Sequence, residues 1–100
     1  MTITITHTDH WVIRLAGEVD VASTAQLRSL AEALSLSEGD VDFDLSRVTF
    51  IDSSGWVEIR KVSTSLDVDG RGVRIVNPSR AVRRLTDALA ALRSSLAPAS

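Results

Sequence analysis

The chain has 100 residues, 44% of them hydrophobic and 24% charged, and a formal net charge of −2. These values are typical of one globular domain and not of a disordered chain. The slightly acidic balance argues against a duplex-binding protein, which needs a positive face. Cysteine is absent, which excludes disulfides, thiol nucleophiles and thiolate metal sites.

Residues 1–96 are expected to form this domain, with residues 97–100 as a flexible C-terminal tail. No apolar run approaches the roughly 20 residues that span a bilayer, and the first residues lack the basic and apolar regions of a signal peptide. We therefore expect a cytoplasmic protein that contacts neither membrane nor nucleic acid directly.

The first predicted elements are two short strands that form an antiparallel hairpin. Threonine and isoleucine alternate over residues 2–6, and residues 11–16 carry apolar side chains on one face, with the period of half-buried strands. His7 and His10 flank the turn. Because no further histidine or carboxylate cluster accompanies them, we expect surface polar residues and not metal ligands.

Three amphipathic helices are expected after the hairpin. In the first, Ser23 and Gln26 have the spacing of a capping box ahead of an apolar stripe that ends near residues 35–39. The second opens after residue 52 and runs to about residue 68, with Ile59, Val62 and Leu66 on its apolar stripe.

The third helix is predicted from Asn77 as N-cap and Pro78 at the first helical position. The arginines along it are expected to form a solvated face. Its apolar stripe is Val82, Leu85, Leu89 and Leu92.

Apolar runs at residues 41–51 and 73–76 lie between these helices and are expected to be strands. Strands separated by helices favour parallel pairing with right-handed crossovers. The predicted fold class is α/β: a small mixed sheet of about four strands, with an N-terminal antiparallel hairpin followed by parallel β-α units, flanked by about three helices.

The stretch from residue 41 to residue 56 is where we expect the protein to act. It delivers Asp52, Ser53, Ser54 and Gly55 to the start of a helix, at the carboxyl end of a strand, where open α/β sheets place functional sites. The first N–H groups of a helix lack intrahelical partners and carry about half a positive charge. Glycine allows another backbone to approach closely.

Either Asp52 or Ser53 can cap this helix. One serine is enough for a cap, so we assign the cap to Ser53 and leave Ser54 as the acceptor of a phosphate group. A phosphate would add about −1.5 to −2 charge beside the helix start. A docked partner would meet that charge next to Asp52 and Asp20, and burying an unpaired phosphate is costly.

Catalysis is a weaker interpretation of the same residues. The G-x-S-x-G nucleophile elbow needs a leading glycine that is missing here, and neither histidine lies late in the chain, where that fold places its base. Gly70 and Gly72 are too few for a P-loop, and no G-K-[ST] follows, so ATP would have to be bound by another protein. A serine hydrolase is retained only as a third hypothesis.

At these residues the sequence resembles the STAS domains, named for sulphate transporters and anti-sigma factor antagonists. Residues 15–20, L-A-G-E-V-D, are similar to the family's L-x-G-E-L-D segment. Residues 43–55, F-D-L-S-R-V-T-F-I-D-S-S-G, are similar to its central D-L-S-x-V-x-x-I-D-S-S-G signature. Residues 73–78 with Val82 and Leu85 resemble its last strand and helix, so the resemblance runs nearly end to end.

The resemblance implies a four-stranded sheet flanked by helices and, in the anti-sigma factor antagonist branch, a partner switch. In that branch a serine kinase, itself the anti-sigma factor, phosphorylates the second serine of D-S-S-G, which is Ser54 here. The unphosphorylated antagonist binds the anti-sigma factor and frees the sigma factor for transcription. The phosphorylated form dissociates from the anti-sigma factor, and a serine phosphatase removes the phosphate so that it can bind again.

The implied protein is therefore not an enzyme and needs no cofactor or metal of its own, since the partner kinase binds ATP. The family's two aspartates are present beside the phosphate acceptor. The residues expected to bind the partner are Asp20, Asp52, Ser53, Ser54, Gly55 and Trp56.

The residues after the signature depart from the family, which commonly continues with leucine and further apolar residues. Trp56 either packs on the domain or is an anchor for the partner, because tryptophan is enriched in binding hot spots. Glu58 is expected to be solvated and to pair with Lys61. A glycine that the family has near the end of its last helix is missing, so residues 87–92 are expected to extend that helix.

These departures keep a second function open. The chain could be a STAS subunit of a transport complex or a larger signalling assembly that never cycles phosphate. The retained serines argue against this alternative.

Overall fold

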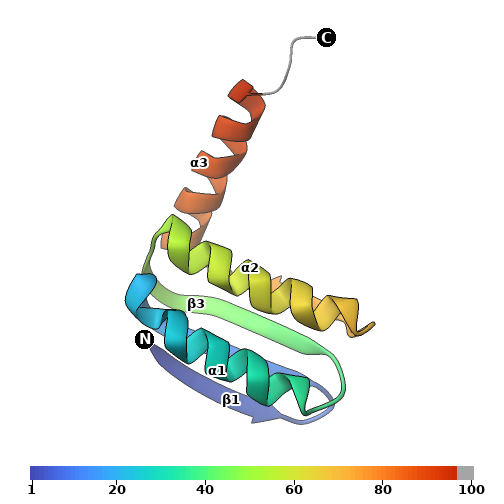
Figure 1. Ribbon diagram of the computed structural model, residues 1–100. Coiled ribbons are helices and arrows are strands. Elements are labelled where there is room, and N and C mark those ends of the chain that lie inside the picture. Colours follow the sequence, from blue (N-terminus) through green and yellow to red (C-terminus); the bar gives the residue numbers. More distant parts are fainter. Residues whose placement is uncertain (97–100) are drawn as a thin grey trace.

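The structure is a computed structural model, and it describes residues 1–96; the predicted tail, residues 97–100, lies outside the described residues. The predicted fold class is confirmed, because four strands form one mixed sheet accompanied by three α-helices (Figure 1). The elements are β1 (Thr2–His7), β2 (Trp11–Val19), a 3₁₀ turn η1 (Val21–Ser23), α1 (Thr24–Ser35), β3 (Val41–Ile51), α2 (Ser53–Val68), β4 (Val73–Val76) and α3 (Arg80–Leu96).

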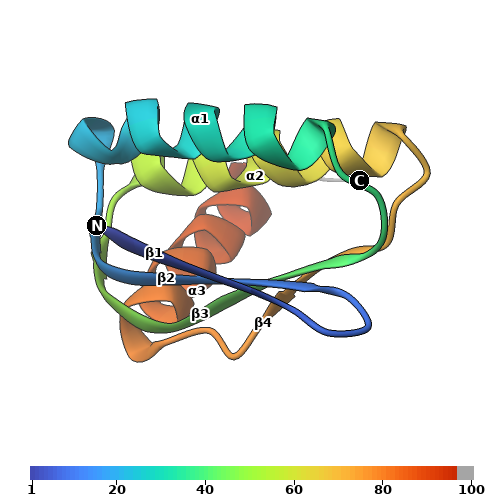
Figure 2. The same ribbon diagram turned by 90° about the horizontal axis from the view of Figure 1, so that it is seen from below.

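The strand order in the sheet is β1-β2-β3-β4. β1 and β2 form the predicted antiparallel hairpin, whereas β3 pairs in parallel with both β2 and β4. The crossover helices α1 and α2 lie side by side over one face of the sheet (Figure 2). Val19 of β2 and Ile51 of β3 are paired neighbours at the carboxyl edge. The residues that follow them therefore leave the sheet close together.

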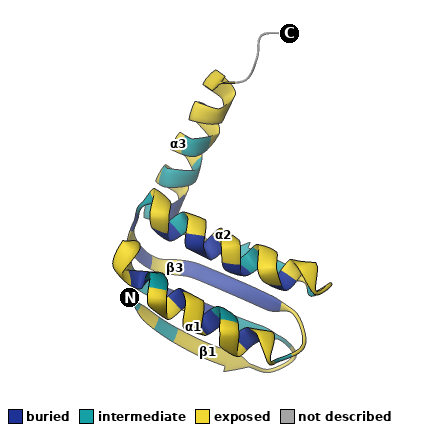
Figure 3. Cartoon of the chain, viewed as in Figure 1, coloured by how far each residue is buried: buried dark blue, intermediate teal, exposed yellow. Residues whose placement is uncertain are grey.

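The hydrophobic core lies between the sheet and the pair α1 and α2. Figure 3 shows the buried stripes of both helices turned toward the strands, as the helical spacing of the apolar residues predicted. The buried side chains include Val41, Phe43 and Leu45 of β3, Leu27, Leu30 and Leu34 of α1, and Ile59, Val62 and Leu66 of α2.

The opposite face of β3 carries two carboxylates that are almost fully buried, Asp42 and Asp44, which are 7% and 5% exposed. Arg74 donates hydrogen bonds of 3.0 and 2.8 Å to Asp42, and these bonds lower the pKa of that carboxyl. Arg14 donates a 3.2 Å bond to Asp44. Burial raises the pKa of Asp44, but the hydrogen bonds that it accepts outweigh burial and lower it.

Ser23 is the N-cap residue of α1, as predicted, but it makes no side-chain cap hydrogen bond to that helix. The capping box consists of Asp20 and Ser23, not of Ser23 and Gln26. The Asp20 carboxylate accepts the N–H of Ala22 at 3.0 Å, and the Ser23 hydroxyl accepts the N–H of Asp20 at 3.3 Å. The reason is the 3₁₀ turn η1 between β2 and α1: the capping box belongs to this turn and lies three residues nearer the N-terminus than predicted. Gln26 donates instead to the carbonyl of Met1 at 3.2 Å.

The start of α3 also differs from the prediction, because α3 begins at Arg80 and not at Pro78. Asn77 has a φ of 51°, in the left-handed region that asparagine tolerates better than most residues, so it turns the chain after β4 and is not an N-cap. Ser79 provides the side-chain acceptor, since its Oγ receives the N–H of Val82 at 3.3 Å.

α3 packs against β3 near its start and then extends beyond the sheet (Figure 1). Val82 is buried, whereas Leu92 is 56% and Leu96 is 75% exposed. The predicted stripe is thus covered only where the helix lies beside β3, and the expected continuation of the helix through residues 87–92 is confirmed. Nowhere in residues 1–96 does a helix combine the length and apolarity needed to cross a membrane.

Candidate functional site

The candidate site is the corner where β2 and β3 end and α2 begins. Asp20 follows Val19 and Asp52 follows Ile51, and these two strand ends are paired. The backbone N–H of Asp52 donates to the carbonyl of Val19 at 3.3 Å, which continues the pairing by one residue. The sheet therefore brings together two aspartates that are 32 positions apart in the sequence.

Asp52 is the N-cap of α2, so the assignment of the cap to Ser53 is wrong. Asp52 has an extended backbone, and its Oδ1 accepts the N–H of Gly55 at 2.8 Å. A carboxylate at this position satisfies a free N–H and also lies at the positive end of the helix dipole. The hydrogen bond from the Gly55 backbone is the main reason why the pKa of Asp52 is lowered.

The two serines occupy the first positions of α2, and both are exposed. The Ser54 hydroxyl donates to Oδ1 of Asp52 at 2.8 Å. Since the lowered pKa keeps Asp52 ionised at neutral pH, the carboxylate can only accept, and this fixes the direction of the hydrogen bond. The structure thus presents Ser54 as an exposed hydroxyl oriented by a carboxylate.

Gly55 fixes the contact between α2 and β2. A Cβ at this position would lie 2.2 Å from the carbonyl oxygen of Val19, far closer than carbon and oxygen can approach. The first turn of α2 therefore rests directly on the backbone at the end of β2. This contact gives the physical reason for glycine after the serine pair.

Trp56 packs on the domain, one of the two possibilities that the sequence left open. The ring is half-buried and lies against the core cluster. It also forms part of the surface, because it lines a groove of about 520 Å³ along α2 together with Val57, Arg60, Lys61, Thr64 and Ser65. Packing on the domain therefore leaves one part of the indole available to a ligand or partner.

Glu58 is not solvated, contrary to the prediction: it is 9% exposed and lies on the buried face of α2. The predicted contact with Lys61 is present, at 3.6 Å, and Arg28 of α1 lies 3.7 Å from the same oxygen. The helical spacing places position 58 beside Ile59 and Val62, so the buried location could have been deduced from that stripe.

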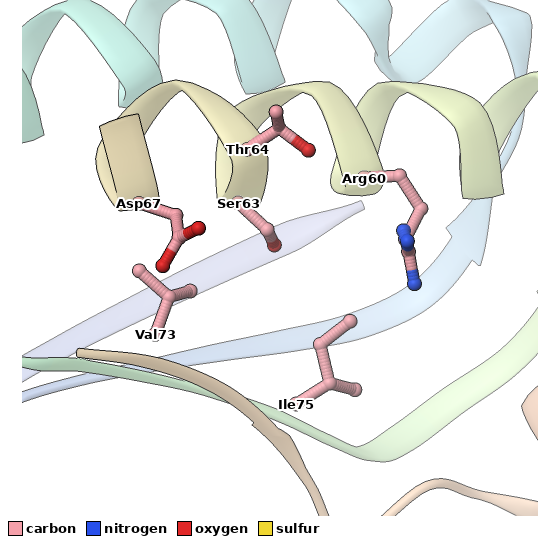
Figure 4. A pocket seen from close by; sticks show the side chains of 6 residues that line it. All are labelled: Arg60, Ser63, Thr64, Asp67, Val73 and Ile75. Atoms are coloured by element: carbon pink, nitrogen blue, oxygen red, sulfur yellow. The ribbon is translucent and has the colours of Figure 1, made fainter. Parts of the chain in front are cut away.

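A second groove lies between α2 and β4. It has a volume of about 330 Å³, and Figure 4 shows side chains of α2 facing Val73 and Ile75 of β4. Arg60 lines this groove as well as the one beside Trp56. Val57 and Arg60 were not predicted as site residues. They follow Ser53 at successive spacings of four and three positions, which places the three residues on one exposed face of α2.

The two histidines lie at the far end of the sheet. His10 Nε2 is 3.0 Å from Asp42 near the start of β3, and the ring of His7 lies against Trp11 at the start of β2. The ten residues from Asp42 to Asp52 span roughly 33 Å of strand, so neither histidine can act on Ser54. Within residues 1–96, no group of three or more histidine, aspartate or glutamate side chains could hold a metal ion.

Comparison with known proteins agrees with this architecture. The STAS domain model matches residues 2–97. No curated protein is similar enough in sequence to count as a match. The structure titled "Crystal Structure Analysis of Mglu" belongs to a longer chain: 77% of this chain aligns with 20% of that chain, at 23% identity and a TM-score of 0.64.

Two anti-sigma factor antagonists are similar over most of their length. Unphosphorylated SpoIIAA has a TM-score of 0.67 and 20% identity over 92% of this chain and 98% of that chain. Phosphorylated SpoIIAA from Bacillus has a TM-score of 0.67 and 23% identity, with 99% and 92% covered. An antagonist from Mycobacterium paratuberculosis has a TM-score of 0.69 and 22% identity, with 94% and 80% covered.

These structural likenesses, all below 25% identity, show the shared fold. The family model covers nearly the whole chain, including the strand ends and the helix start that form the corner. On this evidence the chain belongs to the STAS domain family.

Proposed function

We propose that this chain is an anti-sigma factor antagonist, a protein-binding module switched by phosphorylation of Ser54. The observation that carries the proposal is the exposed Ser54 hydroxyl, which donates to Asp52 at 2.8 Å at the start of α2. Membership of the STAS family and the fold shared with anti-sigma factor antagonists support it. The chain does no chemistry of its own in this function.

The partner is a serine kinase that acts as the anti-sigma factor and binds the ATP. Ser54 fits the role of phosphate acceptor because its hydroxyl is accessible and its proton already points to a carboxylate. An oriented hydroxyl is ready for in-line attack on a γ-phosphate held by the partner. Ser53 is also exposed, but no side-chain hydrogen bond orients its hydroxyl in the described part of the chain.

The unphosphorylated corner is the binding surface, and a phosphate changes its charge. The added charge of about −1.5 to −2 would lie beside the Asp52 carboxylate and near Asp20. No ion pair of residues 1–96 involves either aspartate, so a basic side chain is not already held there to neutralise the phosphate. Burial of this unpaired phosphate in the interface with the kinase is costly, so the phosphorylated antagonist dissociates from the kinase. It can bind again after a serine phosphatase has removed the phosphate.

The test is phosphotransfer with purified anti-sigma-type serine kinases from the same organism. Incubation of the full chain with each kinase and ATP is expected to add one phosphate, located at Ser54 by mass spectrometry. Ser54→Ala should remain unmodified, and Ser53→Ala is the matched control because it should still accept phosphate. Phosphate on another residue, or transfer by none of these kinases, would contradict the proposal. The switch acts in the cytoplasm, where sigma factors and ATP are found.

The second candidate is a STAS subunit that never cycles phosphate. One observation favours it: the Ser54 hydroxyl is already used in a hydrogen bond to the helix cap, which is a structural role. This candidate predicts normal function of the Ser54→Ala variant in cells, and co-purification of the chain with a transport ATPase or a larger signalling assembly.

A further inference from the structure

The exposed face of α2 continues from the serines along the helix. Neighbours on a helix surface are three or four positions apart, so Ser53 or Ser54 is followed on this face by Val57 and then by Arg60 and Lys61. Arg60 lies about 9 Å along the helix from Ser54. The opposite face, which includes Gly55 and Ile59, is buried against the sheet.

This exposed face is hollowed beside the phosphate acceptor. The groove, here called the α2 groove, has a volume of about 520 Å³ and is lined by Trp56, Val57, Arg60, Lys61, Thr64 and Ser65. Trp56 is half-buried and Val57 is 47% exposed, which gives the groove an apolar wall at the end nearer Ser54. Such a wall is the kind of surface on which a protein partner can place an apolar side chain.

The charge changes sign along the face. The serine end carries Asp52, with Asp20 beside it on the adjacent strand end. The groove end carries Arg60, which forms no ion pair with any described residue, and Lys61, which lies 3.6 Å from Glu58. A docked partner therefore meets negative charge at the serines and positive charge two helical turns later.

We propose that the α2 groove is a second contact for the kinase that recognises Ser54, and that it binds an apolar side chain of that partner next to a carboxylate. The apolar side chain lies against Trp56 and Val57, and the carboxylate pairs with Arg60. The inference rests on the proposed function and adds to it the chemistry of the partner segment. It follows from the continuity of the groove with the serine corner and from the positive charge of Arg60 and Lys61 in its lining.

This second contact sets the orientation of the partner. Contacts confined to the serine corner leave the partner more freedom to rotate, whereas a second contact of opposite charge about 9 Å along α2 fixes one orientation. Complementary charges mainly give specificity and fast association. The groove therefore distinguishes kinases that carry the matching acidic and apolar segment from those that do not.

The test measures the affinity and the kinetics of the kinase that modifies Ser54. In Arg60→Glu and Val57→Asp, we expect the Kd of the unphosphorylated complex and the KM for phosphotransfer to rise about tenfold, with kcat retained. Neither substitution touches the core, since both side chains are exposed. The matched controls are Arg84→Glu on α3 and Val68→Asp at the end of α2, which should leave Kd and KM unchanged.

The outcomes separate this inference from the proposed function. Unchanged Kd and KM in both groove variants, or equal losses in the controls, would overturn the groove contact while Ser54 remains the acceptor. A fall in kcat alone would also overturn it, because that result places the two residues in the transfer step. Absence of transfer to Ser54 in the unaltered chain would overturn the proposed function and this inference together. Circular dichroism confirms that each variant is folded.

Discussion

Ser54 and Gly55 share one acceptor atom, Oδ1 of Asp52, which lies 2.8 Å from the Ser54 hydroxyl oxygen and 2.8 Å from the Gly55 nitrogen. The helix cap and the orientation of the hydroxyl are therefore set by the same carboxylate. A change at Asp52 affects the stability of α2 and the geometry of Ser54 together, whereas a change at Ser54 leaves the cap in place.

Removal of the cap should destabilise the domain. Asp52→Ala is expected to lower the free energy of unfolding by about 1 kcal/mol, because the N–H of Gly55 loses its acceptor. Asp52→Asn should cost less, since an amide oxygen still caps. The measurement is urea denaturation followed by circular dichroism. Ser53→Ala is the control and should stay within about 0.5 kcal/mol of the unaltered chain; a loss as large as that of Asp52→Ala would contradict the assignment of the cap.

A side chain at position 55 should be poorly tolerated. Gly55→Ala forces a Cβ against the carbonyl of Val19, and we expect a loss of about 1–3 kcal/mol from overpacking, although alanine is otherwise the better helix former. Thermal and urea unfolding give the value. Ser54→Ala, one position earlier on the exposed face, is the control. An unchanged or higher stability of Gly55→Ala would show that α2 and β2 are not in direct backbone contact.

Replacement of the buried carboxylate should be harmless or favourable. Glu58 lies 3.7 and 3.6 Å from Arg28 and Lys61, distances longer than a hydrogen bond, so these contacts offset little of the cost of burial. Glu58→Met keeps the volume and removes the charge, and we expect a change between zero and about 1 kcal/mol of added stability. Urea denaturation tests this expectation, and a loss of more than about 1 kcal/mol would show that the ion pairs stabilise the domain.

Stability should fall in acid. The pKa values of Asp42, Asp44 and Asp52 are lowered in the folded chain. Their contribution is therefore present above the ordinary aspartate pKa of about 3.9 and is lost as the pH falls through the lower folded values. The urea midpoint measured as a function of pH should decline below about pH 4, and Asp42→Asn should reduce the decline.

His10 should make stability fall as the pH rises, the opposite of the effect of the aspartates. The hydrogen bond to Asp9 is the main cause of its raised pKa, so its contribution is complete below the ordinary histidine pKa of about 6.5 and is lost as the pH rises through the folded value. The same titration of the urea midpoint should show a small decline above that pH. The decline should be absent in His10→Asn, and its persistence in that variant would assign it to another group.

The two halves of α3 should respond differently to truncation. Val82 is 1% exposed and lies in the core cluster, so Val82→Ala should cost about 1–3 kcal/mol. Leu92 is 56% exposed, and Leu92→Ala should stay within about 0.5 kcal/mol. Urea denaturation of both variants tests the packing of α3. Equal losses would mean that the outer half of the helix is covered in solution.

Most of the fold could be predicted because its periodicities are strong. Apolar and polar residues alternate in the hairpin strands, and apolar stripes with helical spacing end at Leu34 and Leu66. These patterns predicted every strand and helix in the right order. Apart from the burial of Glu58, the errors concern helix starts, where several polar residues compete for the same role. Before α1 a 3₁₀ turn intervenes and holds the capping box at Asp20, and at α3 the left-handed backbone of Asn77 moves the start beyond Pro78.

The composition of the corner could be deduced from the sequence, but not its geometry. The sequence placed Asp52, Ser53, Ser54 and Gly55 at a helix start. The hydrogen bond from the Gly55 N–H to Asp52 identifies the capping residue, and the one from Ser54 to Asp52 identifies the oriented hydroxyl. The position of Asp20 beside Asp52 depends on the register between β2 and β3, which no local sequence pattern specifies. The α2 groove could not be predicted, because the residues that line it belong to no recognisable sequence motif.

The contact of Gly55 with Val19 also limits how a signal at this corner can spread. Because helix and strand are already in backbone contact, the first turn of α2 cannot move closer to β2 when a group is attached to Ser54. We expect the backbone amides of the sheet to keep their chemical shifts beyond the immediate neighbours of Ser54. A modification of Ser54 therefore changes the surface of the domain and not its interior, so only a partner that contacts this surface can detect it.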